Sequence, residues 1–534
     1  MTSMLRRTFL GGAAAAAAAP FLPARPALAQ GGRASVLRFV PQSDLTIVDP
    51  VTTTAYVTRN HALMVFDQLY GLDAQFTPQP QMVEGHTVED DGRRWIFRLR
   101  EGLKFHDGEP VRGPDCIASI RRWAQRDSLG QALMARTDAL EAPDDRTFVI
   151  RLKRPYGLML ETLAKLGPPV LVIMPERLAA TDPAQQIPEL IGSGPFRFNT
   201  KERLVGARVV YDRNPDYRPR DDGPVSWVAG PKRVHFERVE WQVMPDPGTA
   251  AAALQNGEVD WWENPISDLV PTLQASPQIA TQLASPLGNL GTGVMNHLYP
   301  PFDKPAVRRV VLEALSQADF MAAAAGDDPK LWRKDVGLFT PGTAMATDAG
   351  LDVLTRPRDL AKAKRDLVAA GYTGERVVLM STSENPVLSA LGEIMHDLLQ
   401  RLGMNVQYVV SDWGTLVTRR ASKAPPDQGG WNIFNTTWTG LDMANPVVEQ
   451  VLRCGGPKGF FGWPDLPELE SLREAWIEAP DQAARKTIAA RMQTLAMRDV
   501  PYLPTGQYFY RTAFRRDLRD VVDGQFVFWN ARRV

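Results

Sequence analysis

The chain has 534 residues, a length that predicts two or three domains, and 44% of them are hydrophobic. Its 61 basic residues balance 61 acidic residues, which gives no electrostatic basis for binding nucleic acid or an anionic membrane surface. The two cysteines, Cys116 and Cys454, are too few for a disulfide scaffold.

Residues 1–29 are predicted to be a cleaved export signal. Arg6 and Arg7 open the twin-arginine motif RRTFL, and an apolar, alanine-rich run follows at 11–22. A membrane anchor is the alternative, but the run is shorter than the ~20 residues that cross a bilayer. No cysteine follows the run to carry a lipid. We therefore expect export by the twin-arginine translocase, cleavage near Ala29 and a periplasmic product.

The first elements expected after the signal are a strand at 36–40, a polar loop at 49–60 and a helix at 63–70. The loop holds Tyr56 and a threonine run at 52–54, which is typical of a segment that caps a helix.

A strand, turn, strand, turn and helix are predicted for 88–123. Trp95, Phe97 and Leu99 alternate with other residues in the period-2 pattern of a half-buried strand. An Asp-Gly pair stands on each side of this stretch, and such pairs tolerate positive φ. Gly113 and Pro114 then open a helix.

The glycines of IGSGPFRF (191–198) are interpreted as turn glycines. They lack the lysine and hydroxyl of a phosphate-binding loop, and a strand follows them in place of a helix. Downstream we expect a strand at 239–243, a short helix at 249–254 and a turn at 256–260.

The chain after Gly288 is predicted to form a partly parallel sheet. One helix is expected at 307–318, with Asp303 as its N-cap, and another at 359–370, ended by Gly371. A strand at 376–380, a helix at 387–402 and a strand at 406–410 make a βαβ unit, whose strands are parallel.

The sequence shows no constellation for catalysis. Its six histidines lack the i, i+4 spacing of a helical zinc site, and no C-x-x-C, G-x-S-x-G, dinucleotide, haem or iron–sulfur motif is present. His106 and Asp107 lie at a turn without a nucleophile nearby and are interpreted as structural. We expect no enzyme activity, no cofactor and no metal site.

Residues suited to binding a small ligand gather late in the chain. Trp413, Trp431 and Trp438 lie near Asp442, and ligand pockets are mainly apolar and aromatic with a few placed polar groups. A place in the core is the alternative for each tryptophan and the preferred interpretation for Trp431.

The stretch from Trp95 to Pro110, W-x-F-x-L-R-x-G-x-K-F-H-D-G-x-P, closely resembles the signature of the family 5 extracytoplasmic solute-binding proteins. These are the dipeptide- and oligopeptide-type receptors of ABC importers. The segments at 191–198 and 212–217 resemble their second signature. The resemblance implies an α/β, three-domain, two-lobed periplasmic solute-binding protein fold of the large, peptide-binding class.

By that resemblance, domain I comprises 33–70, 193–287 and 501–534, and the inserted domain II comprises 71–192. Together they form lobe one. Domain III, 288–500, forms lobe two, with chain crossings near Gly288 and Pro501. The two cysteines then lie in different lobes, so we expect two free thiols; one long-range bridge is the alternative.

The resemblance also implies capture without chemistry. A monomer would engulf a small solute between its lobes by hinge closure and deliver it to the permease subunits of an ABC transporter. Peptides are the leading ligand class, because backbone hydrogen bonds can hold an extended peptide whatever its side chains. Alternatives are an oligosaccharide, a metal chelate or, from another class, an exported hydrolase or redox enzyme.

Four site residues follow from the resemblance. The loop that holds Tyr56 faces the ligand cleft, and Trp413 and Trp438 match aromatic residues that line the pocket. Asp442 matches an aspartate that pairs with a peptide's α-ammonium group, although three residues, not two, separate it from Trp438. No arginine matches the one that some relatives use for a peptide carboxylate.

Overall fold

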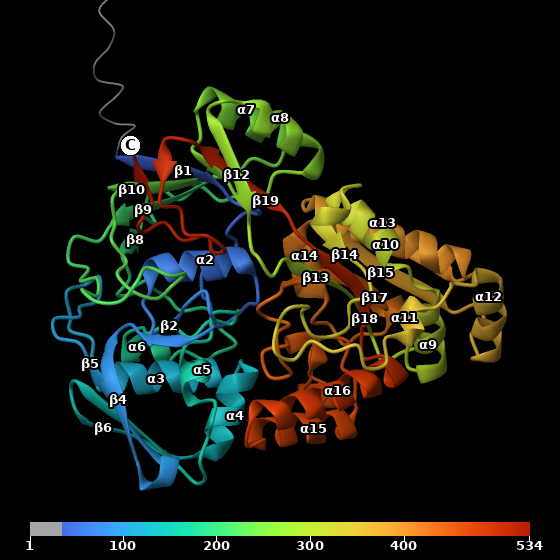
Figure 1. Cartoon of the computed structure of the whole chain (residues 1–534), viewed down its shortest axis with the longest axis horizontal. Coiled ribbons are helices and arrows are strands. Elements are labelled where there is room, and N and C mark those ends of the chain that lie inside the picture. Colours follow the sequence, from blue (N-terminus) through green and yellow to red (C-terminus); the bar gives the residue numbers. More distant parts are fainter. Residues whose placement is uncertain (1–34) are drawn as a thin grey trace, which may run out of the picture.

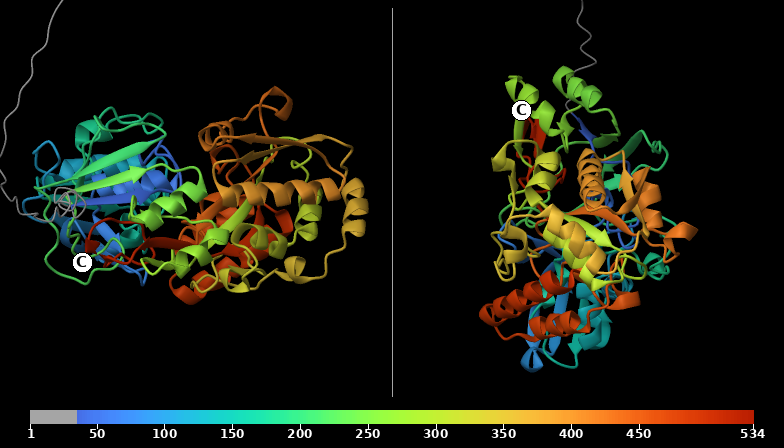
Figure 2. Two further views of the ribbon diagram at one scale, coloured as in Figure 1. Left: turned by 90° about the horizontal axis from the view of Figure 1, so that it is seen from above. Right: turned by 90° about the vertical axis from the view of Figure 1, so that its right-hand side faces the viewer.

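The computed structural model describes residues 35–534, so the predicted export signal lies outside the described residues. Two lobes lie side by side, the blue and green lobe with two large sheets and the yellow and orange lobe with one (Figures 1 and 2). Within 35–534, no helix combines the length and the apolar character needed to cross a membrane.

Lobe one is built on a seven-stranded mixed sheet. In sheet order its strands are β12 (Ile279–Leu283), β19 (Arg511–Arg515), β11 (Trp261–Trp262), β1 (Val36–Val40), β10 (Arg238–Gln242), β9 (Arg208–Arg213) and β8 (Phe196–Phe198). Its helices are α2 (Tyr56–Val65), α7 (Pro247–Asn256) and α8 (Val270–Ala275).

Aromatic side chains tie the C-terminal segment to this sheet. The Phe39 ring lies 4.9 Å from Phe528, 5.3 Å from Trp261 and 5.7 Å from Trp241, measured between centroids. All four side chains are buried. Since large aromatic groups dominate the free energy of core burial, these last residues are part of the core of lobe one.

Lobe one also carries an antiparallel four-stranded sheet. Its strands are β4 (Val83–Glu89), β5 (Arg94–Leu99), β7 (Thr147–Leu152) and β6 (Thr137–Asp144). The accompanying helices are α3 (Gly113–Ala124), α4 (Ser128–Arg136), α5 (Met159–Leu163) and α6 (Glu176–Ala179), and a small hairpin joins β2 (Tyr70–Leu72) to β3 (Pro78–Pro80). The predicted strand β5 is confirmed, and Gly92 and Gly108 adopt positive φ.

The two signature segments meet at His106. Its backbone N–H donates to the Gly192 carbonyl (2.8 Å), Nδ1 accepts from the Gly192 N–H (3.4 Å) and Nε2 lies 3.2 Å from the Gly194 carbonyl. Burial lowers the pKa of His106 to about 4. A Cβ on Gly192 would lie 2.0 Å from the Val65 carbonyl oxygen, so the turn packs directly against the end of α2 and needs glycine. His106 thus holds the two segments together, and a strand, not a helix, follows the glycines, as predicted.

Lobe two is built on a six-stranded sheet. Its strands are β14 (Trp332–Arg333), β18 (Leu503–Tyr508), β13 (Asn289–Met295), β17 (Ile433–Thr439), β15 (Arg376–Thr382) and β16 (Asn405–Ser411). Its helices are α9 (Pro305–Ala314), α10 (Gln317–Ala325), α11 (Asp352–Thr355), α12 (Leu360–Ala369), α13 (Pro386–Arg401), α14 (Trp413–Arg419), α15 (Pro467–Glu478) and α16 (Gln482–Asp499).

The predicted βαβ unit is confirmed, because β15 and β16 pair in parallel on either side of α13. Gly371 and Gly403 take positive φ of 90° and 86° at helix ends, as C-cap glycines do. The helix predicted at 307–318 is instead two helices that break at Leu315, and α9 begins after Lys304 without a side-chain cap from Asp303.

The helix near residue 60 also differs from the prediction: it begins at Tyr56 and ends at Val65. Thr58, Arg59, Asn60 and His61 are buried on it, so its polar residues hid the helix from a search for an apolar stripe.

Strand β18 pairs with β13 and β14, so residues 503–508 belong to the sheet of lobe two, and the last crossing follows Tyr508, not Pro501. Cys116 and Cys454 are both free, as expected, and both are buried.

Candidate ligand-binding cleft

A cavity of about 70 Å³ lies between the lobes. Lobe one contributes the segments 42–43 and 54–57, and lobe two contributes residues from α13, α14 and β17. Tyr56, Trp413 and Trp438 all line it, so the structure brings three of the four predicted site residues together. Trp431 is fully buried against Phe434 and belongs to the core.

Local structure fixes both cleft tryptophans. Asp412 caps α14 by accepting from the Thr415 N–H (2.8 Å), which starts the helix at Trp413. The Trp413 N–H in turn donates to Glu384 (2.9 Å). Trp438, on β17, is only 3% exposed and packs edge-on against Phe460. The walls of the cavity are therefore aromatic and held in place.

Asp442 lies at a contact between the lobes and does not line this cavity. Its Oδ2 accepts from the Tyr56 hydroxyl (2.5 Å) and the Thr439 hydroxyl (2.7 Å). The Tyr56 oxygen also accepts from the Thr439 N–H (2.8 Å). Burial, and then the Asp442 carboxylate, raise the pKa of Tyr56 well above its usual value. Tyr56 thus joins α2 of lobe one to β17 and the following turn of lobe two.

Gly167 of lobe one covers the other oxygen of Asp442. A Cβ added to Gly167 would lie 1.6 Å from Oδ1, which is far shorter than any contact between a carbon and an oxygen that are not bonded. The carboxylate therefore sits directly against the backbone of the opposite lobe.

Arg420, at the end of α14, is a cleft residue that the sequence analysis missed. Its side chain is 5% exposed, donates to the Thr54 hydroxyl of lobe one (3.2 Å) and lies 4.7 Å from the Phe461 ring. No acidic side chain within 35–534 pairs with it, its Nε has no partner, and burial lowers its pKa to about 10. The spacing could have revealed it, since Arg420 is seven residues after Trp413 and so lies on the same helix face.

A smaller polar cavity of about 50 Å³ adjoins the first and shares Gln42 and Tyr56 with it. Glu263 lines it, accepts from the Gln42 N–H (2.7 Å) and has its pKa raised to about 7 by burial. Within 35–534, no group of three His, Cys, Asp or Glu side chains is arranged to hold a metal ion. The cleft thus offers aromatic walls, hydroxyls, an unpaired cation and a buried carboxyl, which suits binding.

Comparisons with known proteins agree with this arrangement. Residues 77–455 match the model of the bacterial extracellular solute-binding proteins, family 5. The chain is 37% identical over 493 residues, 92% of each chain, to a probable peptide ABC transporter periplasmic-binding protein of Sinorhizobium fredii.

Two solved structures share the fold. The A. tumefaciens R10 protein AgaA, in complex with agropinic acid, has a TM-score of 0.79 at 20% identity over 93% of this chain and 99% of that one. The Helicobacter pylori protein DppA, in complex with the peptide STSA, has a TM-score of 0.78 at 19% identity over 95% and 99%. The chain belongs to family 5 of the bacterial extracellular solute-binding proteins.

Proposed function

We propose that the chain is the periplasmic substrate-binding component of an ABC importer and that it captures short peptides between its lobes. The observation that carries this proposal is the aromatic cavity, which is built jointly by both lobes and contains an unpaired cation. The name of the Sinorhizobium fredii relative supports a peptide ligand, periplasmic placement and delivery to ABC permease subunits.

We divide lobe one into domain I and the inserted domain II near residues 71 and 192, and assign 288–508 to lobe two. Within 35–534, the chain then passes between the lobes at 284–288 and 509–510, each time between strands of different sheets. Two short crossings form a hinge, and a ligand closes it by contacting both lobes at once.

In the closed cleft, Trp413 and Trp438 pack against the peptide and Arg420 takes its terminal carboxylate, because a buried cation gains most from an opposite charge. Asp442 remains a prediction as the contact for the peptide amine. An ammonium group would have to replace the Tyr56 hydroxyl that now donates to this carboxylate.

A thermal shift screen followed by titration calorimetry tests the proposal. Di- and tripeptides should raise the melting temperature and be recovered unchanged, with a stabilisation of about 2.7 kcal/mol at a hundredfold excess over Kd. Oligosaccharides and metal chelates in the same screen test the alternative solutes. Stabilisation by those and not by peptides would reject a peptide receptor, and turnover of a compound would reject pure binding.

We also propose export by the twin-arginine route with cleavage near Ala29, on the motif at Arg6 and Arg7 alone. Replacing both arginines with lysine should leave the precursor in the cytoplasm. Normal export of that variant would reject this route.

A further inference from the structure

A second, larger cavity between the lobes opens beside Arg420. It measures about 650 Å³ and shares Thr54, Val417 and Arg420 with the aromatic cavity. Lobe one contributes the threonine loop and the turn between α3 and α4, and lobe two contributes α14 and the segment 450–461. This volume lies within the ~300–1,000 Å³ of small-molecule sites. We call it the basic cavity.

Its charged lining is entirely positive. Arg126 reaches it from lobe one, and Arg420, Arg453 and Lys458 reach it from lobe two, whereas no aspartate or glutamate lines it. Within 35–534, none of the four makes an ion pair.

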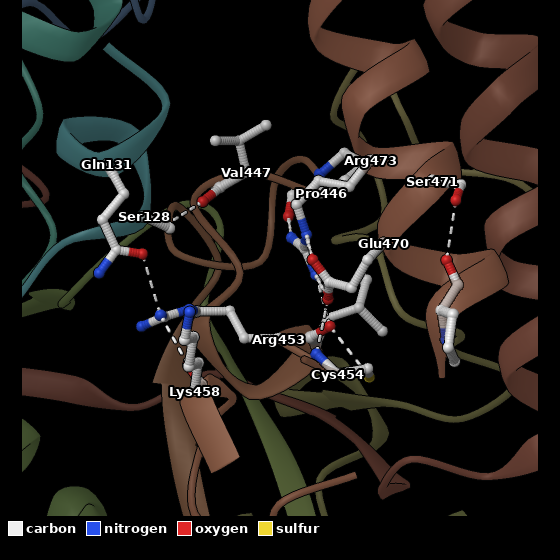
Figure 3. Close-up of polar contacts among 12 residues, drawn as sticks. Ser128, Gln131, Pro446, Val447, Arg453, Cys454, Lys458, Glu470, Ser471 and Arg473 are labelled. Carbon is white, nitrogen blue, oxygen red and sulfur yellow. Dashed lines mark hydrogen bonds and ion pairs between the residues drawn. The ribbon is translucent and has the colours of Figure 1, made fainter. Parts of the chain in front are cut away.

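The hydrogen bonds of these cations go to neutral groups. Arg453 donates to the Gln131 side chain across the lobe boundary (3.1 Å) and to the Lys458 carbonyl (3.0 Å), as Figure 3 shows. None of the four is therefore paired directly with an acidic side chain among the described residues.

The nearby acids are already engaged. Asp127 is buried against Lys165, and Glu470 pairs with Arg473. Figure 3 shows Glu470 beside Arg473 and above Cys454, whose backbone N–H donates to it (2.6 Å). Burial lowers the pKa of Arg453; the negative charges of Asp127 and Glu470 oppose this, and the positive charges of Arg473 and Arg126 add to it. Arg453 is thus a partly buried cation that makes no ion pair within 35–534.

Closure brings these charges together, because Arg126 belongs to one lobe and the other three cations to the opposite lobe. Like charges in a partly desolvated space oppose closure, and an anion placed among them removes that cost. A ligand shifts the hinge only by preferring the closed form, so a negative group has a direct means of driving closure.

We propose that the basic cavity binds an acidic side chain of the ligand, so that the receptor selects peptides carrying a carboxylate besides the terminal one. This inference rests on the proposed function of the aromatic cavity as a peptide site. The threonine hydroxyls at 52–54, Gln125 and Gln450 line the same space and offer further hydrogen bonds to a carboxylate.

The test compares the tripeptides Ala-Ala-Glu and Ala-Ala-Gln, which share a terminal carboxylate and differ by one charge. By calorimetry, the wild-type protein should bind Ala-Ala-Glu about tenfold tighter or more, a ratio that corresponds to about 1.4 kcal/mol. Arg453→Gln and Lys458→Gln should each reduce the ratio toward one while Ala-Ala-Gln binding is kept. Lys458 is exposed, so that variant leaves the core intact if Arg453→Gln does not fold. Lys364→Gln removes an exposed charge on α12 of the same lobe and should leave the ratio unchanged.

Equal affinity for the two peptides, or a preference that survives Arg453→Gln and Lys458→Gln, overturns the inference and leaves the peptide proposal standing. If neither peptide binds, the peptide proposal fails. The preference of the basic cavity for a carboxylate is then tested with two small compounds that are not peptides, glutarate and glutaramide. Glutarate should then raise the melting temperature of the wild type, and glutaramide should not. The effect should shrink in Lys458→Gln; no difference between the two compounds overturns the inference.

Discussion

Arg420 is a buried cation whose side chain makes one hydrogen bond among the described residues, to a hydroxyl of the opposite lobe. An unpaired buried charge destabilises a fold. Removing the charge should therefore stabilise the ligand-free protein while it weakens peptide binding. Arg420→Gln should leave the melting temperature of the ligand-free protein unchanged or raised, and weaken peptide binding by about tenfold or more. Arg420→Lys should keep part of the affinity. Scanning calorimetry without ligand measures the melting temperature, and titration calorimetry measures the peptide affinity. Unchanged affinity in Arg420→Gln would show that Arg420 does not contact the ligand.

The role of Asp442 can be separated from that of Tyr56 by a double-mutant cycle. If Asp442 serves the contact with Tyr56, then Tyr56→Phe, Asp442→Asn and the double variant should lose similar peptide affinity, ~1–3 kcal/mol. If Asp442 pairs with a ligand ammonium group, Asp442→Asn should cost about 3–5 kcal/mol, and N-acetylated peptides should no longer distinguish it from wild type. Titration calorimetry of all four proteins decides between these outcomes.

At the scale of elements, the segment after α5 sets how closely the lobes approach. Gly167→Ala places a Cβ 1.6 Å from the Asp442 carboxylate, so the closed contact cannot form unchanged. We expect weaker peptide binding and a larger radius of gyration with ligand, measured by X-ray scattering, with unchanged helix content. Gly157→Ala is the matched control, because its Cβ would meet only Arg485, at 3.5 Å. Wild-type affinity in Gly167→Ala would show that closure tolerates a wider gap.

The elements that the sequence predicted are those whose signals are local. The unit β15–α13–β16 has an Asn385 cap, a C-terminal glycine and apolar strands, and each acts within a few residues. Helix α2 was predicted to begin several residues after its true start. The helix is buried on several sides, so its polar residues do not form one solvent-facing stripe that a periodicity search could detect. Tyr56, Trp413 and Trp438 were predicted from the family resemblance. The spacing of Arg420 from Trp413 could have revealed that residue. The basic cavity is formed by side chains of both lobes, so no spacing within one element predicts it.

At the scale of the whole molecule, buried titratable groups predict a stability maximum near pH 6.5. Burial lowers the pKa of His61 and His297 to about 3 and of His106 to about 4. As the pH falls below about 6.5, these histidines take up protons in the unfolded chain before they do so in the folded one. The free energy of unfolding therefore falls with falling pH. Burial raises the pKa of Glu263 to about 7 and of Glu449 to about 8. These carboxyls ionise first in the unfolded chain as pH rises from about 4.5, so they lower stability up to about pH 8.

Below about pH 6.5 the three histidines outweigh the two carboxyls, and above about pH 6.5 the carboxyls outweigh the histidines. Denaturant titrations from pH 4.5 to 8.5 measure this profile. Glu449→Gln should reduce the fall in the free energy of unfolding above pH 6.5. The fall on the acid side of the maximum should remain. A profile without a maximum would contradict the assigned directions.

The whole molecule should remain a monomer and become more compact when a peptide binds. The lobes meet through Tyr56 and Asp442, through Ser128 and the Val447 carbonyl (2.5 Å), and through Arg136 and Glu474 (2.8 Å). We expect a smaller radius of gyration in scattering from the complex than from the free protein. An unchanged radius would exclude hinge closure, and a doubled mass would exclude a monomer.

The position of strands β18 and β19 gives the chain an unusual order of completion. β18 lies between β14 and β13 in one sheet, and β19 lies between β12 and β11 in the other, so residues 503–515 fill an interior place in both lobes. Until residues 503–515 take their places, each of the two sheets keeps a gap with unpaired strand edges. Neither lobe can finish folding ahead of the other, and a chain truncated before β18 leaves both sheets incomplete. Strands β18 and β19 therefore couple the completion of the two lobes, and loss of residues 503–515 should unfold both.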